Sequence, residues 1–199
     1  MFKPGQLRLI GIGYQIGVGK DTVADYMCAT FGFRKMRFAD PLKEAVAAIY
    51  GWSRESLEEQ EFKATVDKFW GITPRTALQL VGTEAMRNNV DKDIWIKAMQ
   101  RRLSSYAASN KDPSVVVTDT RFINEVETIK EMGGKVIRVI RPDNEFTTGG
   151  AVGQHASELE LDGYDDWDYT IINDGDLKKL RIEIDKAMIT LDLFYESTR

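Results

Sequence analysis

A glycine-rich stretch near the start of the chain carries the residue types that bind phosphate. An apolar run, residues 7–12, leads into a turn that contains Gly13, Gly17, Gly19 and Lys20, and a helical pattern follows at once. Glycines let successive backbone N–H groups curve around an anion, and the N-terminus of the following helix adds its positive dipole. The lysine adds a point charge for phosphate oxygens. This stretch therefore predicts a phosphate-binding loop between a strand and a helix.

The loop departs from the usual spacing G-x-x-x-x-G-K-[ST] at two positions. Tyr14 stands where the first glycine is usual, with Gly13 one place early, and Asp21 follows the lysine where Ser or Thr is usual. A glycine turn that merely packs tightly is the alternative interpretation. The rest of the pattern favours phosphate binding, because the loop still joins a strand to a helix. The residues that we expect around the phosphates are Gly13, Gly17, Val18, Gly19, Lys20, Asp21 and Thr22.

A second group of polar residues follows a run of β-branched residues. Residues 115–118 indicate a buried parallel strand, and Asp119 and Arg121 come directly after it. The carboxyl ends of parallel strands form the ligand edge of such a sheet, and an apolar strand that ends in Asp matches the Walker-B pattern. We therefore expect Asp119, with Thr22 or Asp21, to hold Mg²⁺ directly or through water, and Arg121 to face the same crevice.

Residues 74–86 form a candidate helix with polar side chains on one face. Arg75, Gln79 and Thr83 are four residues apart, so they stack on that face. A row of arginine, amide and hydroxyl suits a monophosphate and a base, and an ordinary solvated face is the alternative. The segment 82–84 interrupts the apolar pattern, which indicates a bend or a close approach of two elements.

Two polar residues stand directly before prolines at predicted helix starts. Asp40 precedes Pro41, and Thr73 precedes Pro74, so both are predicted to be helix N-caps. Asp40 also follows a candidate strand, residues 34–39, where it is equally a candidate for facing substrate. The charged run 53–67 has the composition of a solvated surface, and we assign it no chemistry.

The composition excludes several classes of protein. The chain has 199 residues, 43% of them hydrophobic, and a formal net charge of −4, which argues against a general nucleic-acid binder. The single cysteine, Cys28, makes no internal disulfide, as in a reducing cytoplasm, and a small core residue is its expected role. No membrane span or signal peptide is expected, so we expect no membrane partner.

The alternation of five candidate strands with helices predicts an α/β fold. We expect three layers, with a five-stranded, mainly parallel sheet covered by helices on both faces. We expect one domain over residues 1–199, with a core at about 1–50 and 110–199 and a helical substrate-binding insertion at about 51–109. Residues from about 143 to 167 are polar and glycine-rich, and we expect them to form a lid.

Motifs over nearly the whole chain are shared with one enzyme family. They are G-K-D-T at 19–22, F-A-D-P-L-K at 38–43, the polar residues of 74–87, D-I-W at 93–95, T-D-T-R-F at 118–122 with Glu125, R-P at 141–142 and H-A-S-E at 155–158. With these motifs the chain resembles the deoxynucleoside monophosphate kinases of bacteriophages and their bacterial relatives, within the nucleoside-monophosphate-kinase-like P-loop fold. The resemblance implies Mg²⁺-dependent transfer of the γ-phosphate of ATP to a deoxynucleoside 5′-monophosphate, giving the diphosphate and ADP, in the cytoplasm, or in the host cytoplasm if the protein is viral.

The resemblance also implies roles for individual residues. Lys20, Asp21 and Arg121 would be catalytic, and Arg141, His155, Ser157 and Glu158 would belong to the lid. Guanidinium groups suit phosphate oxygens, and a tryptophan such as Trp70, Trp95 or Trp167 could stack on the base, although core packing is the alternative for each. The expected substrate-binding residues are Asp40, Lys43, Trp70, Arg75, Gln79, Thr83, Glu84, Arg87, Trp95, Asp119 and Arg121.

Two alternative functions are compatible with the sequence. The first keeps the fold and changes the acceptor to dephospho-coenzyme A or a phosphorylated alcohol. The second is a non-catalytic nucleotide-binding module, which Tyr14 in the loop would support. The sequence does not rank the bases that would be accepted. It also leaves open whether the protein forms a homodimer.

Overall fold

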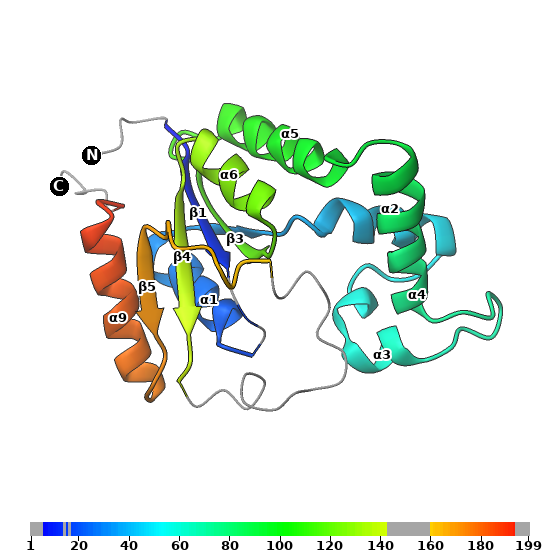
Figure 1. The fold of residues 1–199 in the computed structure, drawn as a ribbon, viewed down its shortest axis with the longest axis horizontal. Coiled ribbons are helices and arrows are strands. Elements are labelled where there is room, and N and C mark those ends of the chain that lie inside the picture. Colours follow the sequence, from blue (N-terminus) through cyan, green and yellow to red (C-terminus); the bar gives the residue numbers. More distant parts are fainter. Residues whose placement is uncertain (1–5, 14, 16, 143–159, 194–199) are drawn as a thin grey trace. The chain divides into compact units, whose positions relative to one another are not determined.

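The computed structural model describes residues 6–13, 15, 17–142 and 160–193 (Figure 1). Tyr14 and the expected lid residues His155, Ser157 and Glu158 lie outside these ranges. The chain divides into two compact units, which we describe separately. Unit 1 comprises residues 1–37 and 103–199, and unit 2 comprises residues 38–102.

In the described part of unit 1, five strands form one sheet in the order β2-β3-β1-β4-β5, and all their pairings are parallel. The strands are β1 (Arg8–Gly13), β2 (Arg34–Met36), β3 (Ser114–Thr120), β4 (Lys135–Ile140) and β5 (Tyr169–Ile172). Every residue of the central strand β1 is buried, which fits an apolar run that is covered on both faces. The predicted parallel sheet is confirmed, and its carboxyl edge lies where β1 and β3 end.

Helices cover both faces of the sheet, as the α/β prediction required. Helices α1 (Lys20–Phe31) and α9 (Leu177–Thr190) pack on one face, where Ile10, Ile12 and Val116 meet their apolar side chains. Helix α6 (Ile123–Glu131) covers the other face, because Ile129 lies directly over Gly11. The three layers of the predicted architecture are therefore present in unit 1 (Figure 1).

Unit 2 is helical. It contains α2 (Asp40–Tyr50), the 3₁₀ turn η1 (Ser56–Glu58), α3 (Gln60–Ala64), α4 (Pro74–Gln79) and the π-helix η2 (Leu80–Arg87). The boundary between the units falls within α5 (Ile94–Ser109). Val46, Leu57 and Ala77 form the buried centre of unit 2. The unit begins at Phe38, so it includes α2, which the sequence analysis assigned to the core.

The two predicted N-caps have different outcomes. Thr73 caps α4 as predicted, because its hydroxyl accepts a hydrogen bond from the backbone N–H of Thr76 at 3.1 Å. The prediction for Asp40 is wrong, since Ala39 occupies the N-cap position and Asp40 is the first residue of α2. The Asp40 carboxylate instead accepts a hydrogen bond from Arg54 at 2.7 Å.

The interruption that the sequence predicts at residues 82–84 is real. The α-helical hydrogen bonding of α4 changes to π-helical over η2, which has Gly82 as its buried residue. A Cβ at Gly82 would lie 2.6 Å from a methyl group of Leu42, so a larger residue would require the Leu42 side chain to shift. Among the described residues, no helix is both long and apolar enough to cross a membrane.

Candidate functional site

Two glycines give the predicted phosphate loop its shape. Gly17 and Gly19 have φ angles of 77° and 97°, in the left-handed region that favours glycine. Gly19 is the N-cap of α1 and supplies no side-chain cap, so the first turn of α1 keeps backbone N–H groups for an anion. The ammonium group of Lys20 donates a hydrogen bond to the carbonyl of Gln15 in the same loop. The lysine therefore contacts the backbone of the loop that precedes it.

Asn173 fastens this loop to the sheet. It directly follows β5, and its Nδ2 donates a hydrogen bond of 2.9 Å to the carbonyl of Val18. The same Nδ2 lies 2.7 Å from the position that a Cβ on Gly19 would occupy, so a larger residue at 19 would displace it. Asn173 is not among the residues expected at the loop from the sequence. The signal that could have identified it is a polar residue at the carboxyl end of a parallel strand.

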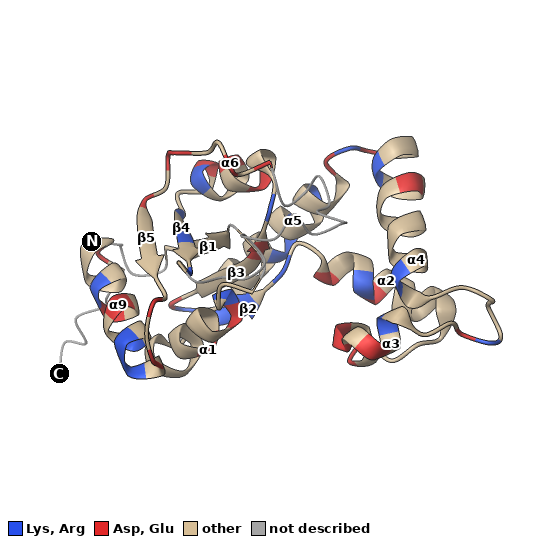
Figure 2. Ribbon diagram, turned by 60° about the horizontal axis from the view of Figure 1, so that its bottom comes forward, with Lys and Arg blue, Asp and Glu red and all other residues tan. Residues whose placement is uncertain are grey.

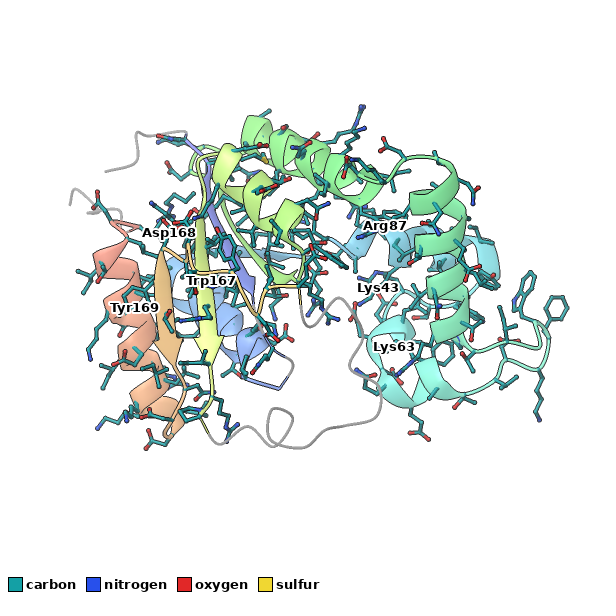
Figure 3. All side chains as sticks on the ribbon, in the orientation of Figure 1. Lys43, Lys63, Arg87, Trp167, Asp168 and Tyr169 are labelled. Atoms are coloured by element: carbon teal, nitrogen blue, oxygen red, sulfur yellow. The ribbon has the colours of Figure 1, made fainter. Side chains whose placement is uncertain are left out.

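Trp167 lies over the start of the loop. Its ring approaches to 2.9 Å from the position of a Cβ on Gly13, and the carbonyl of Thr120 lies 3.0 Å from the same point (Figure 3). The Trp167 indole donates a hydrogen bond of 2.7 Å to the carbonyl of Tyr164, which holds the ring in place. A side chain at position 13, where β1 ends, would therefore crowd the Trp167 ring and the Thr120 carbonyl. This steric reason for Gly13 is separate from the phosphate motif.

The pairing of β3 with β1 shifts by one residue close to Asp119. Gly11 pairs with Val117, but Gly13, two residues further along β1, pairs with Thr120, three residues further along β3. Thr120 lies on the face that α6 covers, since its Oγ1 is 3.2 Å from the position of a Cβ on Gly11. A bulge of this kind interrupts the alternation of side chains along a strand, so the local sequence pattern does not predict the direction of Asp119.

Asp21 pairs with cations instead of standing alone in the loop. Its Oδ1 lies 2.9 Å from Arg37 Nη2 and 3.4 Å from Lys35 Nζ, and both cations belong to β2 or directly follow it. Basic and acidic residues accordingly meet where β2 lies beside α1 (Figure 2). Partial burial raises the pKa of the Asp21 carboxyl, but the hydrogen bond and charge of Arg37, with the charge of Lys35, outweigh it and lower the pKa overall.

The start of α6 is held by two carboxylates. The buried Glu125 accepts hydrogen bonds from the backbone N–H groups of Arg121, at 2.8 Å, and Phe122, at 3.2 Å. Glu160 accepts another from the N–H of Ile123 at 3.1 Å. These bonds fix the backbone of Arg121 directly after β3, while its side chain remains exposed. The structure thus places Asp119 and Arg121 at one strand end, as the sequence predicts.

In unit 2, two expected substrate residues belong to one network of ion pairs. Asp40 pairs with Arg54 at 2.7 Å, Arg54 pairs with Glu58 at 2.5 Å, and Glu58 pairs with Lys43 at 2.7 Å. Arg54 and Glu58 lie in the charged run that the sequence analysis treated as a solvated surface. Their charges alone could not identify them as partners, because the pairing depends on how η1 packs beside α2.

The other expected substrate residues of unit 2 have different surroundings. Trp95 is 7% exposed and donates a hydrogen bond of 3.0 Å to the carbonyl of Gly82, so the structure gives it a packing position with no face available for a base. Trp70 is partly exposed and packs edge-on against Tyr50. Arg75 contacts Gln60 at 3.2 Å. Gln79, Thr83 and Glu84 are exposed, and Arg87 is half-buried.

Lys43, Lys63 and Arg87 lie along one side of unit 2 in the view of Figure 3. They come from α2, α3 and η2, so elements separated in the sequence contribute basic side chains to that side. Lys43 and Arg87 are among the expected substrate residues, and the sequence analysis did not single out Lys63. In unit 1, Arg141 follows β4 directly and is exposed at the carboxyl edge of the sheet.

Solved structures show the class of fold. Dephospho-CoA kinase from Campylobacter jejuni superimposes with a TM-score of 0.51 at 17% identity, and the match covers 92% of this chain and 97% of that one. Together with the parallel sheet and the loop before α1, this likeness defines a three-layer P-loop kinase fold. At this identity the likeness concerns the fold alone.

Sequence comparisons show the family. The model of the family described as deoxynucleotide monophosphate kinase matches residues 55–184. A protein of Acanthamoeba polyphaga mimivirus, provisionally named deoxynucleotide monophosphate kinase, is 34% identical, with 88% of this chain and 93% of that protein covered. The deoxynucleotide monophosphate kinase of Escherichia phage RB69 is also 34% identical, over 62% of this chain and 47% of its own length. This chain belongs to the deoxynucleotide monophosphate kinase family, and it is a phosphotransferase of the nucleoside monophosphate kinase type.

Proposed function

We propose that this protein transfers the γ-phosphoryl group of ATP to the phosphate of a deoxynucleoside 5′-monophosphate, which gives ADP and the deoxynucleoside diphosphate. The observation that carries the proposal is the loop before α1, with left-handed Gly17 and Gly19 and an uncapped helix start, in a chain of this kinase family. Such a loop binds the phosphates of a nucleotide through backbone N–H groups.

In this proposal the protein positions and neutralises its substrates. An oxygen of the acceptor phosphate attacks the γ-phosphorus, and the bond from that phosphorus to the bridging oxygen of ADP breaks. Lys20 and the N–H groups of the loop hold the donor phosphates, and the Arg121 guanidinium stabilises the charge on the transferring group. Lys20 exchanges its present partner, the Gln15 carbonyl, for phosphate oxygens when ATP binds.

The residues at the loop suit Mg²⁺ bound mainly by substrate oxygens. In the described part of the chain, no three His, Cys, Asp or Glu residues cluster as a metal site. Mg²⁺ in kinases is usually held by one or two protein groups together with phosphates and water. Asp119 near the carboxyl end of β3 and the exposed Thr22 in the first turn of α1 fit that arrangement. When bound, the ion would neutralise charge on the phosphates.

For the acceptor, we propose that unit 2 is the substrate-binding insertion. Its Asp40, Lys43, Arg75 and Arg87 carry the charges that would recognise a nucleoside monophosphate, and Trp70 has an exposed edge for a base. The segment 143–167 is proposed as the lid, to which Arg141 leads. Since the family members reported above are viral or phage proteins, we propose the host cytoplasm as the place of action.

A coupled assay that measures ADP formation tests this function. The enzyme is incubated with ATP and Mg²⁺ and with each ribo- and deoxynucleoside monophosphate in turn, and the diphosphate is identified by chromatography. We expect turnover with one or more deoxynucleotides. Turnover with dephospho-coenzyme A alone would move the assignment to a different small-molecule kinase, and saturable ATP binding without any product would indicate a binding module.

A further inference from the structure

Asp21 is the residue that departs from the usual phosphate-loop motif, and the structure gives it cationic partners. It is the second residue of α1, directly after Lys20. Its carboxylate holds Arg37 at 2.9 Å and Lys35 at 3.4 Å, and Lys35 also pairs with Asp25, one turn further along α1. Of the two cations, Arg37 is therefore the nearer partner of Asp21.

This pairing brings the Arg37 guanidinium to the first turn of α1. Arg37 directly follows β2, so it leaves the sheet at the same carboxyl edge as the phosphate loop. Lys20, Lys35 and Arg37 bring three positive charges to the first turn of α1 or to its partner Asp21. Positive charge at a helix N-terminus favours the binding of an anion. A guanidinium has five N–H donors in a planar fork, which lets one nitrogen bind a carboxylate while others bind phosphate.

We propose that Arg37 binds a phosphate group of the nucleotide at the start of α1, and that Asp21 is the positioning residue that holds its guanidinium there. This inference rests on the proposed function. It also explains why Asp replaces Ser or Thr after the lysine, because a hydroxyl could not hold an arginine and a lysine by charge. The hydroxyl that the motif requires is then supplied by Thr22.

The pairing contributes little to stability, so variants of it should fold. The side chain of Asp21 is 65% exposed, and ion pairs at exposed sites add little to the free energy of unfolding. The informative variants are Asp21→Asn, Arg37→Ala and the double variant. Asp25→Asn is the matched control, because it removes a carboxylate of the same helix that pairs with Lys35.

Two measurements test the proposal. The first is the equilibrium affinity for a fluorescent ATP analogue and for a deoxynucleoside monophosphate, and the second is kcat and KM at saturating Mg²⁺. For Arg37→Ala we expect affinity for one of the two nucleotides, or kcat/KM, to fall about tenfold or more, as charged hydrogen bonds to phosphate suggest. Asp21→Asn should show part of this loss, the double variant should be no worse than Arg37→Ala, and Asp25→Asn should change little.

Three results would overturn the inference. Wild-type affinity and turnover in Arg37→Ala would remove Arg37 from the site. Losses that multiply in the double variant would show that Asp21 acts independently of Arg37. A raised Mg²⁺ requirement in Asp21→Asn, with Arg37→Ala unchanged, would make Asp21 a metal ligand. The binding measurement decides the matter even if no acceptor is phosphorylated, so failure of the proposed function is distinguishable from failure of this inference.

Discussion

The ammonium group of Lys20 donates a hydrogen bond to the carbonyl of Gln15. In the proposed reaction the same group of Lys20 would contact the donor phosphates. Its ammonium lies at the start of α1, outside the apolar centre of unit 1. Its loss should therefore affect chemistry much more than folding.

We predict that Lys20→Met lowers kcat by about a hundredfold or more, as for the loss of a main donor to a charged transition state. The melting temperature should stay close to that of the wild type. Steady-state kinetics and thermal unfolding of the same preparation check both statements. Unchanged turnover would exclude the proposed phosphate site.

Asn173 provides a second prediction for a single residue. Asn173→Ala removes the 2.9 Å hydrogen bond to the Val18 carbonyl, which leaves the loop free to change shape. We expect KM for ATP to rise about five- to tenfold, the cost of one lost hydrogen bond at a binding loop. Asp174→Asn is the control, because it removes only an exposed ion pair with Lys179 in the same turn. An equal rise in both variants would contradict the fastening role.

At the level of elements, α2 and η2 pack closely at Gly82. Gly82→Val places methyl groups where Leu42 now packs, since even a Cβ would lie 2.6 Å from a Leu42 methyl group. We predict a loss of about 1–3 kcal/mol in the free energy of unfolding. Urea denaturation measures it. In a Leu42→Ala background the same substitution should cost much less, and an equal cost in both backgrounds would place the strain in the π-helix itself.

The ion-pair network of unit 2 joins η1 to α2. Arg54→Met removes the shared partner of Asp40 and Glu58. Glu58 is also the partner of Lys43, so the substitution affects all three residues. We predict a rise of about tenfold in KM for the deoxynucleotide, because the proposed acceptor residues lose their fixed positions. Arg102→Met, which removes an equal charge from the exposed pair with Glu44, should leave KM near the wild-type value. Equal effects would mean that only net charge matters.

For the whole molecule, the carboxyl groups set the dependence of stability on pH. The pKa values of Asp21, Glu44, Asp67, Asp91 and Asp174 are all lowered in the folded protein. For Asp67 the main causes are the hydrogen bonds from the Trp52 indole and the Trp70 backbone. A lowered pKa means that the unfolded chain binds more protons, so stability is complete above the unfolded values and is lost as pH falls through the folded ones.

We therefore predict a melting temperature that is nearly constant between about pH 6 and pH 8 and falls progressively below about pH 4, near the ordinary pKa values of Asp and Glu. Thermal unfolding over a series of buffers measures it. In Asp67→Asn the melting temperature should fall slightly less steeply as the pH is lowered below about 4. A melting temperature that rises as pH falls from 6 to 4 would contradict the assignment of these pKa directions.

The sequence determined the elements and the type of site. Local patterns were sufficient for this, since β-branched runs, glycine spacing and Thr73 before proline depend on nearby residues and on backbone preferences. The strand β3, Ser114–Thr120, contains the β-branched run 115–118 that predicts it. The parallel sheet and the kinase family followed from the same patterns and motifs.

Tertiary structure decided which groups meet. The register shift in β3 beside Asp119 is revealed by no local pattern, because it arises from pairing with β1. The partners Arg37, Arg54 and Asn173 reach their sites from other elements, and Trp95 is buried with its indole donating a hydrogen bond to the carbonyl of Gly82 in η2. A sequence specifies periodicity along the chain, whereas ion pairs, bulges and close packing depend on distances between segments that only the folded molecule brings together.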